Sequence, residues 1–148
     1  MHCTFKKLSG ADLSMVLAMN RSFREHFIDG VSAERFLNNE KNWIFAAVRD
    51  GTIIGFAYGY ELNRLDRNEN MLYIYEVGVM DRYQRQGIGF AMMTELLRTC
   101  GQRNICKCFL TTYQNNAAAN ALYRKLGGQV PEPSQGKDTV YYFPIPIK

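Results

Sequence analysis

Near the middle of the chain, a strand-like segment is followed by two closely spaced glycines and then by a helical pattern. Residues 71–80 are rich in aromatic and β-branched side chains, which is typical of a strand. From 84 to 100 apolar residues recur at helical spacing, so a helix is predicted to begin close to Gly87 and Gly89. A further strand at 106–112 completes a strand-helix-strand unit, which requires a parallel strand pair and a right-handed crossover. This unit constrains the fold to a sheet with a helix on its face.

The rest of the sequence supplies strands and helices in an order that fits one mixed domain. Asp50-Gly51 separates two strand-like segments and offers the backbone freedom that a two-residue hairpin needs. Ser9 and Asp12 resemble a capping box before a first helix. Further strands are predicted at residues 2–8, 43–49, 52–61 and 139–147, and further helices after Ser32 and after Asn116. The order β-α-α-β-β-β-α-β-α-β predicts an α/β fold over residues 1–148, in which helices flank one mixed sheet in a single domain.

Charge and apolar patterning restrict the expected partners. The formal net charge of +4 favours an anionic ligand. Basic residues are scattered without a long Lys/Arg run, and the aromatic residues fall in strand-like segments, so nucleic acid is not expected as a partner. The longest apolar runs have the length of strands, and the start of the chain lacks an apolar stretch behind a basic head. We therefore expect no membrane partner, no export and a cytoplasmic location.

The spacing of the cysteines is not that of a metal-binding site or of a disulfide-rich scaffold. Cys3, Cys100, Cys106 and Cys108 do not form paired C-x-x-C motifs, and the chain adds only two histidines. Cys106 and Cys108 lie in an apolar stretch, where small buried side chains are common. Four reduced thiols and no metal site are expected.

The segment from Gln84 to Gly89 can bring a phosphate group close to the backbone. Gly87 and Gly89 have no Cβ to keep a ligand away, and the first helical turn has free N–H groups and a partial positive charge. Arg85 adds a full charge. A P-loop is excluded because no Lys-Ser/Thr follows Gly89, and a dinucleotide-binding loop because Met92 replaces its third glycine. The segment predicts a pyrophosphate site, although the same glycines would also ease a tight turn with no ligand.

Two segments resemble the GNAT superfamily of N-acetyltransferases. Within the segment from Val79 to Gly89, Gln84-Arg85-Gln86-Gly87-Ile88-Gly89 is similar to its coenzyme A signature, (Gln/Arg)-x-x-Gly-x-(Gly/Ala). Residues 116–127 are similar to a later motif, Asn-x-x-Ala-x-x-Leu-Tyr-x-x-Leu-Gly. The order of elements extends the likeness over nearly the whole chain. The resemblance implies a GNAT-like fold with a splayed central sheet. It also implies an enzyme that takes acetyl from acetyl-CoA without a metal, releases coenzyme A and acts on an amine.

The resemblance implies roles for individual residues. In the family, the strand before the glycine loop parts from its neighbour and pairs with the pantetheine arm of the cofactor. Tyr123 would protonate the departing thiolate, because a phenol with a pKa of ~10 keeps its proton at neutral pH. Tyr123 could instead be a helix residue whose ring packs on the sheet. The implied cofactor contacts are Val77, Val79, Gln84, Arg85, Gln86, Gly87, Ile88, Gly89, Asn116 and Tyr123.

Glu76 is an unusual residue for a central strand. Carboxylates are depleted in strands, and this one lies between Tyr75 and Val77 beside the expected cofactor cleft. An ammonium acceptor must lose a proton before it attacks a thioester, so Glu76 is interpreted as the base of a direct transfer, acting itself or through water. A backbone N–H near Val77 would steady the oxyanion. Two alternatives stay open: Glu76 as a partly solvated charge paired with an arginine, and a covalent route through Cys108.

Residues 73–77, Tyr-Ile-Tyr-Glu-Val, resemble the strand before the glycine loop in aminoglycoside 3-N-acetyltransferases. Aminoglycosides are polycations, so their pocket is expected to be lined with carboxylates. The chain departs from that subfamily at residues 143–146, Phe-Pro-Ile-Pro, where the subfamily has acidic residues. The predicted substrate-binding residues are Glu25, Asp29 and Glu76, with Glu34, Asp66 and Glu69 as further candidates.

The class of the acceptor is therefore the least constrained part of the prediction. The leading acceptor is an aminoglycoside acetylated at its 3-N position, an antibiotic-resistance activity. Another small amine, such as a polyamine or an amino-acid derivative, and a protein amino group are the alternatives. A regulatory module that binds acyl-CoA without transferring the acyl group is a further one, as is a domain with no ligand. A homodimer is a possible assembly, suggested by the apolar C-terminal strand and by the resemblance.

Overall fold

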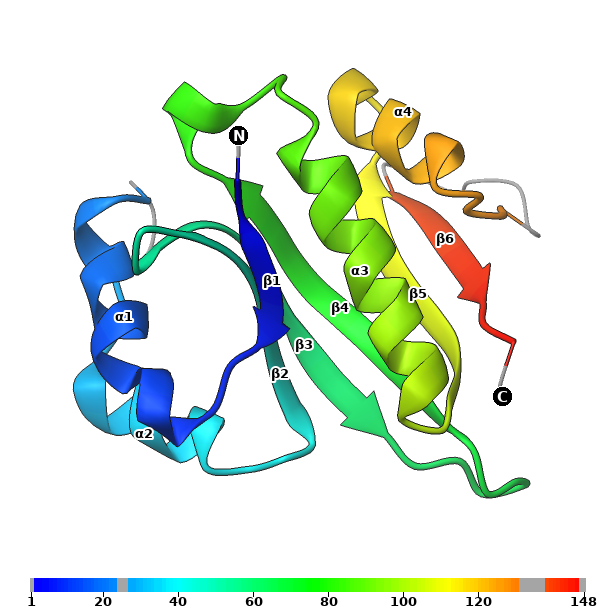
Figure 1. The fold of residues 1–148 in the computed structure, drawn as a ribbon. Helices are drawn as coiled ribbons and strands as arrows, with labels where there is room; N and C mark the ends of the chain where they lie inside the picture. Colours follow the sequence, from blue (N-terminus) through cyan, green and yellow to red (C-terminus); the bar gives the residue numbers. More distant parts are fainter. Residues whose placement is uncertain (1, 24–26, 131–137, 147–148) are drawn as a thin grey trace.

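Six strands form one sheet in chain order, β1-β2-β3-β4-β5-β6 (Figure 1). The computed structural model describes residues 2–23, 27–130 and 138–146. Only β4 and β5 are parallel, and every other neighbouring pair is antiparallel. The strands are β1 (Thr4–Lys7), β2 (Asn42–Arg49), β3 (Thr52–Leu62), β4 (Asn70–Val79), β5 (Ile105–Tyr113) and β6 (Asp138–Pro144). In the sequence, β4 precedes and β5 follows the helix that begins at the glycines, so the single parallel pair is the one that the strand-helix-strand pattern predicts.

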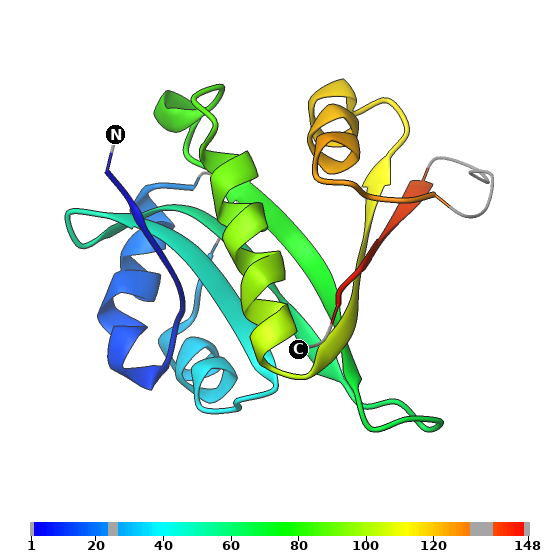
Figure 2. The same cartoon turned by 45° about the vertical axis from the view of Figure 1, so that its right-hand side comes forward.

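Helices cover both faces of the sheet (Figures 1 and 2). The α-helices are α1 (Leu13–Leu17), α2 (Gly30–Leu37), α3 (Ile88–Gln102) and α4 (Ala117–Lys125), and the 3-10 turns are η1 (Gly10–Asp12), η2 (Ala18–Arg21) and η3 (Asp81–Tyr83). Side chains of α3 and α4 share one buried cluster with the sheet, including Met92, Leu96 and Tyr123. Side chains of α1 and α2 form a second cluster on the opposite face, including Val16 and Leu37. Of the helices in the described ranges, none is long and apolar enough to cross a membrane.

The predicted order of elements is confirmed, and the differences concern where elements begin and end. The second helix was predicted after Ser32, but it starts at Gly30 with Asp29 as its N-cap. The helix predicted to begin close to Gly87 and Gly89 begins at Ile88 with Gly87 as its N-cap, which confirms that prediction. The last strand ends at Pro144 and does not reach residue 147. Prolines lack the N–H that a ladder needs, which explains the early end.

The β2–β3 hairpin turns where the sequence predicts it. Asp50 and Gly51 have φ angles of 52° and 73°, the positive values that a tight two-residue hairpin needs. The strands on either side are registered from Arg49 opposite Thr52 outward. The hairpin is therefore determined by local turn chemistry.

Strands β4 and β5 pair over only part of their length. Their register runs from Asn70 opposite Ile105 to Tyr73 opposite Phe109, and the rest of β4 pairs with β3 alone. Beyond Tyr73 the two strands diverge toward the glycine loop and α4 (Figure 2). The splayed sheet implied by the family resemblance is confirmed. Backbone groups on this side of β4 have no strand partner there, so they are open to an extended ligand.

Candidate functional site

Residues 84–89, which we call the glycine loop, are held in place by the side chains of their own two glutamines. Gln84 Nε2 donates to the Val79 carbonyl oxygen at 3.0 Å and to Asp81 Oδ1 at 3.3 Å. Gln86 Nε2 donates to the Arg82 carbonyl oxygen at 3.1 Å. These bonds hold the loop between β4 and α3 in one shape. The Nε2 groups of Gln84 and Gln86 therefore support the loop.

The first turn of α3 presents unpaired amides beside an open backbone. Gly87 is the N-cap, with φ of 81°, and it supplies no side-chain cap. The Ala91 N–H bonds the Gly87 carbonyl oxygen at 3.0 Å, so the amides of residues 88–90 have no acceptor within the helix. A Cβ added at Gly87 would meet no atom within 4 Å. This geometry offers free donors, and the exposed Arg85 beside them adds a positive charge.

Val77 and Val79 lie on the stretch of β4 that has parted from β5. Both are half-buried and pack against the cluster under α3. The Val79 Cγ2 atom lies 3.8 Å from the Cβ position built at Gly89, an ordinary van der Waals separation. The open edge of β4 therefore leads directly to the glycine loop.

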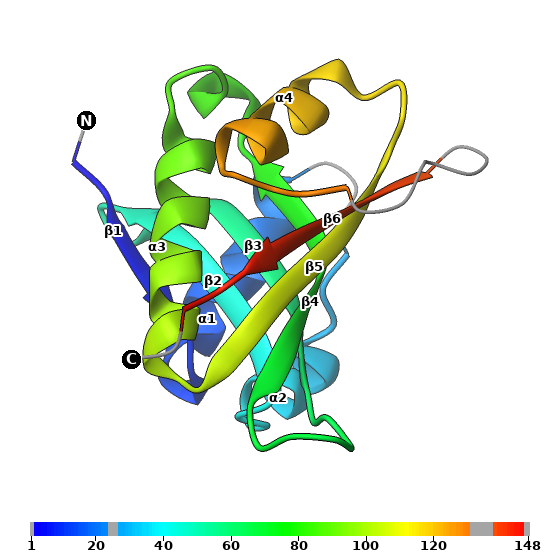
Figure 3. The same ribbon diagram turned by 90° about the vertical axis from the view of Figure 1, so that its right-hand side faces the viewer.

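Helix α4 lies beside strands β5 and β6 (Figure 3), and its residue Tyr123 is buried in the cluster that α3 and α4 share with the sheet. Its ring centroid is 5.4 Å from that of Tyr141 and 6.3 Å from that of Phe143. Burial, with a smaller contribution from Cys108, raises the pKa of the Tyr123 phenol to about 12. The Tyr123 ring packs on the sheet, as in the alternative interpretation of this residue as a packing residue of the helix. Its hydroxyl also keeps its proton at neutral pH, as a proton donor must.

Cys108 is poorly suited to nucleophilic catalysis. It is fully buried on β5, and burial raises the pKa of its thiol well above the ordinary value, so the reactive thiolate is not formed at neutral pH. All four cysteines are free, as predicted. The described part of the chain contains no group of three or more His, Cys, Asp or Glu side chains that could hold a metal ion.

Asn116 and Asn120 organise the start of α4. Asn116 Oδ1 accepts the Ala119 N–H at 3.1 Å, which confirms the predicted cap. Asn120 is buried; its Nδ2 donates to the Asn116 carbonyl oxygen at 2.7 Å, and its Oδ1 accepts from the Tyr141 hydroxyl at 2.6 Å. Asn120 was not among the site residues predicted from the sequence. An amide three residues before Tyr123, on the apolar side of a helix, was the available signal.

Glu76 lies on the opposite face of the sheet from Tyr123. It is the register partner of Tyr58 on β3, and directly opposed residues of an antiparallel pair share a face. The register shifts between Tyr58 and Gly59, so Tyr75 is an extra residue on β4 that has no partner on β3. The pKa of Tyr58 is raised to about 12, mainly by burial and next by the negative charge of Glu76. The carboxylate therefore lies close to Tyr58, on the face that α1 and α2 cover.

Aromatic rings continue across this face from β3 to β5. The Tyr58 and Tyr75 ring centroids are 5.4 Å apart, those of Tyr73 and Tyr75 are 6.3 Å apart, and Tyr73 stacks on Phe109 at 5.1 Å. Tyr75 is largely exposed. The surroundings of Glu76 on this face are thus mostly aromatic.

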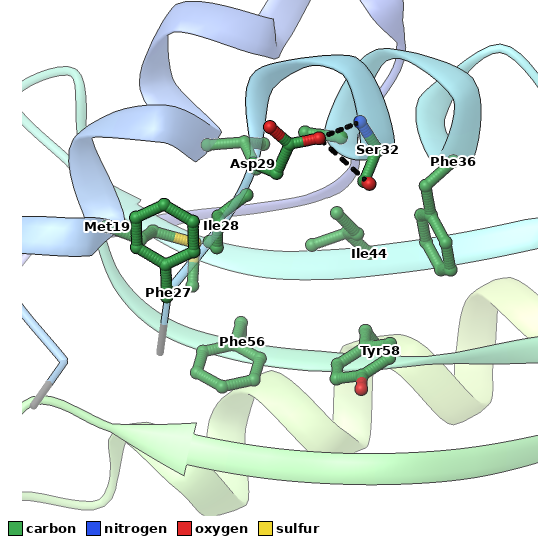
Figure 4. A pocket seen from close by; sticks show the side chains of 11 residues that line it. Met19, Phe27, Ile28, Asp29, Ser32, Phe36, Ile44, Phe56 and Tyr58 are labelled. Atoms are coloured by element: carbon green, nitrogen blue, oxygen red, sulfur yellow. Dashed lines mark hydrogen bonds between the residues drawn. The ribbon is translucent and has the colours of Figure 1, made fainter. Parts of the chain in front are cut away.

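A pocket of about 290 Å³ lies between the α1–α2 region and strands β2 and β3 (Figure 4). We call it the α1/α2 pocket. Its lining residues are Val16, Met19, Phe27, Ile28, Asp29, Ser32, Ala33, Phe36, Ile44, Phe56 and Tyr58. Asp29 Oδ2 accepts the Ser32 N–H and the Ser32 hydroxyl, each at 3.0 Å. Among the lining residues in the described part of the chain, the single carboxylate, Asp29, is therefore already engaged as a helix cap.

The predicted acidic residues do not gather in one place. Asp29 lines the α1/α2 pocket, whereas Glu25 lies outside the described residues. Glu34 is exposed on α2 and is not a lining residue. Asp66 pairs with Arg64 at 3.3 Å in the β3–β4 loop, which also holds Glu69. That loop precedes β4, while the glycine loop follows it, so the two loops lie at opposite ends of the strand.

Comparisons with known proteins agree with this geometry. A sequence model described as the acetyltransferase (GNAT) family matches residues 14–128, which is more than half of the chain. The chain belongs to the GNAT family. The glycine loop and α4 both lie within the matched region of this GNAT protein, together with Glu76.

Curated relatives of this GNAT protein differ in their acceptors. It is 32% identical over 94 residues to a [ribosomal protein bS18]-alanine N-acetyltransferase of Escherichia coli K12, covering 64% of this chain and 55% of that protein. It is 31% identical over 111 residues to an L-2,4-diaminobutyric acid acetyltransferase of Vibrio parahaemolyticus, covering 66% of this chain and 60% of that protein. The chain thus spans little more than half the length of these relatives.

A solved structure with the same fold comes from an uncultured soil metagenomic sample. It is an aminoglycoside acetyltransferase in complex with sisomicin, with a TM-score of 0.76 and 20% sequence identity. The alignment covers 90% of this chain and 93% of that one. At this identity the likeness concerns the fold, which is the GNAT fold predicted from the sequence.

Proposed function

We propose that this GNAT protein transfers an acetyl group directly from acetyl-CoA to a primary amine. One observation carries the proposal: β4 parts from β5 directly before a glycine-opened helix start. An extended, diphosphate-bearing ligand would meet unpaired strand groups along one part of its length and free helix amides at the other. The family and the acetyltransferase relatives support the same activity.

The residues of the loop fit the diphosphate of coenzyme A. Gly87 leaves open space where a Cβ would stand, and Arg85 provides a charge beside it. Ile88 and Gly89 contribute first-turn amides. Gln84 and Gln86 would hold the loop in shape, which refines their predicted role as direct contacts. The remaining proposed contacts are Val77 and Val79 along the arm of the cofactor, and Asn116 and Tyr123 from the side of α4.

Glu76 is proposed to accept a proton from the acceptor, and Tyr123 is proposed to donate one to the departing thiolate. The two residues lie on opposite faces of the sheet, Glu76 on β4 and Tyr123 on α4 against β6. Glu76 accepts a proton from the ammonium group of the acceptor, directly or through water, and the freed amine forms the C–N bond at the acetyl carbonyl. A backbone N–H near Val77 stabilises the oxyanion. The C–S bond then breaks, and Tyr123 donates its proton to the thiolate; the second proton that the nitrogen loses as the amide forms returns through solvent to the Tyr123 phenolate.

Several acceptors are consistent with this chemistry. An aminoglycoside acetylated at its 3-N position is supported by residues 73–77 and by the sisomicin-bound structure of similar fold. The relatives named above act on a protein alanine and on diaminobutyric acid, which supports a protein amino group or another small amine. An acyl-CoA-binding regulatory module would bind the cofactor and acetylate none of these. The proposed homodimer and cytoplasmic location stay predictions.

The activity is tested by measuring binding and transfer separately. Titration calorimetry with acetyl-CoA is expected to give a one-site isotherm. At ~100 times the dissociation constant the cofactor should stabilise the fold by about 2.7 kcal/mol. Release of free thiol should then require an added amine from a panel of sisomicin, spermidine, diaminobutyric acid, simple monoamines and peptides. Binding without thiol release for any amine would indicate the regulatory module instead.

Replacing Glu76 by glutamine is expected to lower kcat/KM for the amine by about 30-fold at pH 7. Water can also reach a half-buried site, so the loss is smaller than the ~10²-fold or more typical of a positioned base. The deficit should shrink as the pH rises toward the pKa of an alkylammonium, ~10, because the acceptor then arrives deprotonated. Glu34→Gln, on the exposed side of α2, is the matched control. A deficit that stays constant from pH 7 to 10 would argue against a base.

A further inference from the structure

The α1/α2 pocket is apolar over nearly its whole lining. Its walls come from aliphatic side chains such as Met19 and Ile44 and from the rings of Phe36 and Phe56. Among the eleven lining residues, only Asp29, Ser32 and Tyr58 carry polar side-chain atoms. Asp29 and Ser32 are hydrogen-bonded to each other at the N-terminus of α2. The interior therefore offers dispersion contacts and little hydrogen bonding.

The pocket leads to the proposed base through one residue. Tyr58 lines the pocket and is also the register partner of Glu76 on β4. In Figure 4 the Phe56 and Tyr58 side chains lie side by side along one wall, across the pocket from Asp29 and Ser32 of the α2 region. A molecule whose amine reaches Glu76 would place the adjoining part of its structure over Tyr58 and into this pocket.

The charge of the lining argues against a polycation. Each ammonium group that leaves water needs a carboxylate or several acceptors, and the lining residues that the structure describes supply one carboxylate, which already accepts two hydrogen bonds. A peptide backbone meets the same difficulty, because its N–H and C=O groups would lose water without gaining partners. An alkyl or aromatic group gains free energy on entering such a site.

We propose that the α1/α2 pocket binds an apolar group of the acceptor, and that the acceptor is a small primary monoamine bearing an aromatic or branched alkyl substituent. This proposal rests on the proposed acetyltransferase function and narrows its substrate class. The volume of about 290 Å³ suits such a group. A dry cavity of ~150 Å³ holds benzene, so this pocket has room for a phenyl ring and a short chain.

The first test compares acceptors that differ in one group. With saturating acetyl-CoA, kcat/KM for 2-phenylethylamine is expected to exceed that for ethanolamine by about 30-fold, the ratio expected for burying one aromatic ring. Sisomicin and spermidine are expected to have lower kcat/KM values than 2-phenylethylamine. A peptide with an N-terminal phenylalanine presents the same ring joined to a peptide backbone, so it tests whether the site accepts a backbone.

The second test changes the rim of the pocket. Phe27 lines the pocket although it is 89% exposed, so Phe27→Ser should leave the fold intact and raise KM for 2-phenylethylamine about fivefold. Leu65→Ser is the matched control, because Leu65 is fully exposed in the β3–β4 loop and lines no part of the pocket. Neither substitution should change the affinity for acetyl-CoA. Saturation-transfer NMR of 2-phenylethylamine with coenzyme A present reports binding independently of transfer.

The outcomes separate this proposal from the function on which it rests. Acetylation of sisomicin, spermidine or the peptide with a kcat/KM above that of 2-phenylethylamine would overturn the apolar monoamine and leave the acetyltransferase standing. Equal KM values in Phe27→Ser and Leu65→Ser would also overturn it. NMR binding that Phe27→Ser weakens, without acetylation of any amine, would support the apolar site and reject the transferase. Absence of NMR binding would reject the apolar site.

Discussion

Replacing Tyr123 by phenylalanine is expected to lower kcat by about 10³-fold, within the range of positioned proton transfer, while the Kd for acetyl-CoA changes less than about twofold. The phenol is buried, and its pKa of about 12 keeps it protonated up to strongly alkaline pH. Rate loss through its ionisation should therefore begin only above pH ~10, the ordinary tyrosine pKa. Steady-state kinetics and calorimetry on the same preparation measure the two quantities.

Tyr141→Phe is the matched control for the loss of a buried hydroxyl. It removes the 2.6 Å hydrogen bond to Asn120 and should cost about 1 kcal/mol of unfolding free energy. Turnover should stay near the wild-type value, because Tyr141 has no proposed part in proton transfer. If Tyr123→Phe kept more than a tenth of the wild-type kcat, Tyr123 would be a packing residue alone.

Replacing Gly87 by valine is expected to raise the Kd for acetyl-CoA by about 100-fold. The new side chain would enter space where no protein atom lies within 4 Å of its Cβ, beside the free amides at the start of α3. Losing two charge-assisted hydrogen bonds at ~1.5 kcal/mol each accounts for a change of this size. Titration calorimetry with acetyl-CoA is the measurement.

Gly51→Val separates this effect from backbone strain. Gly51 has a φ of 73° against 81° for Gly87, and a Cβ there also meets nothing within 4 Å. Both substitutions force a β-branched residue into the left-handed region, so both should lower the melting temperature by a similar amount. Only Gly87→Val should weaken cofactor binding. Equal affinity in the two variants would leave the glycine loop without a role in holding the diphosphate.

Much of the fold was predictable because its signals are local. Asp50-Gly51 adopts the positive φ values of a two-residue hairpin wherever such a turn occurs. Asn116 caps α4 through an amide only three residues away. The helix after the glycines follows from apolar spacing within one segment. Two motifs in the expected order then identified the family, because each is contained in a single stretch of chain.

The positions of the acidic candidate residues were not predictable, because they depend on register and on packing between distant segments. A carboxylate in the sequence does not reveal which pocket it faces. Asp29 faces the α1/α2 pocket but caps α2, and Asp66 lies in the loop before β4. Asn120 acquires its role only when β6 brings Tyr141 against α4.

The sequence by itself determined the order of elements, the hairpin, the Asn116 cap and the glycine loop, since short-range sterics and hydrogen bonding decide each of them. Only the tertiary structure decided that Tyr75 is an extra residue opposite β3, that Glu76 shares a face with Tyr58, and that the nearby pocket is apolar. Strand register is a long-range property: one additional residue changes which face every later side chain takes.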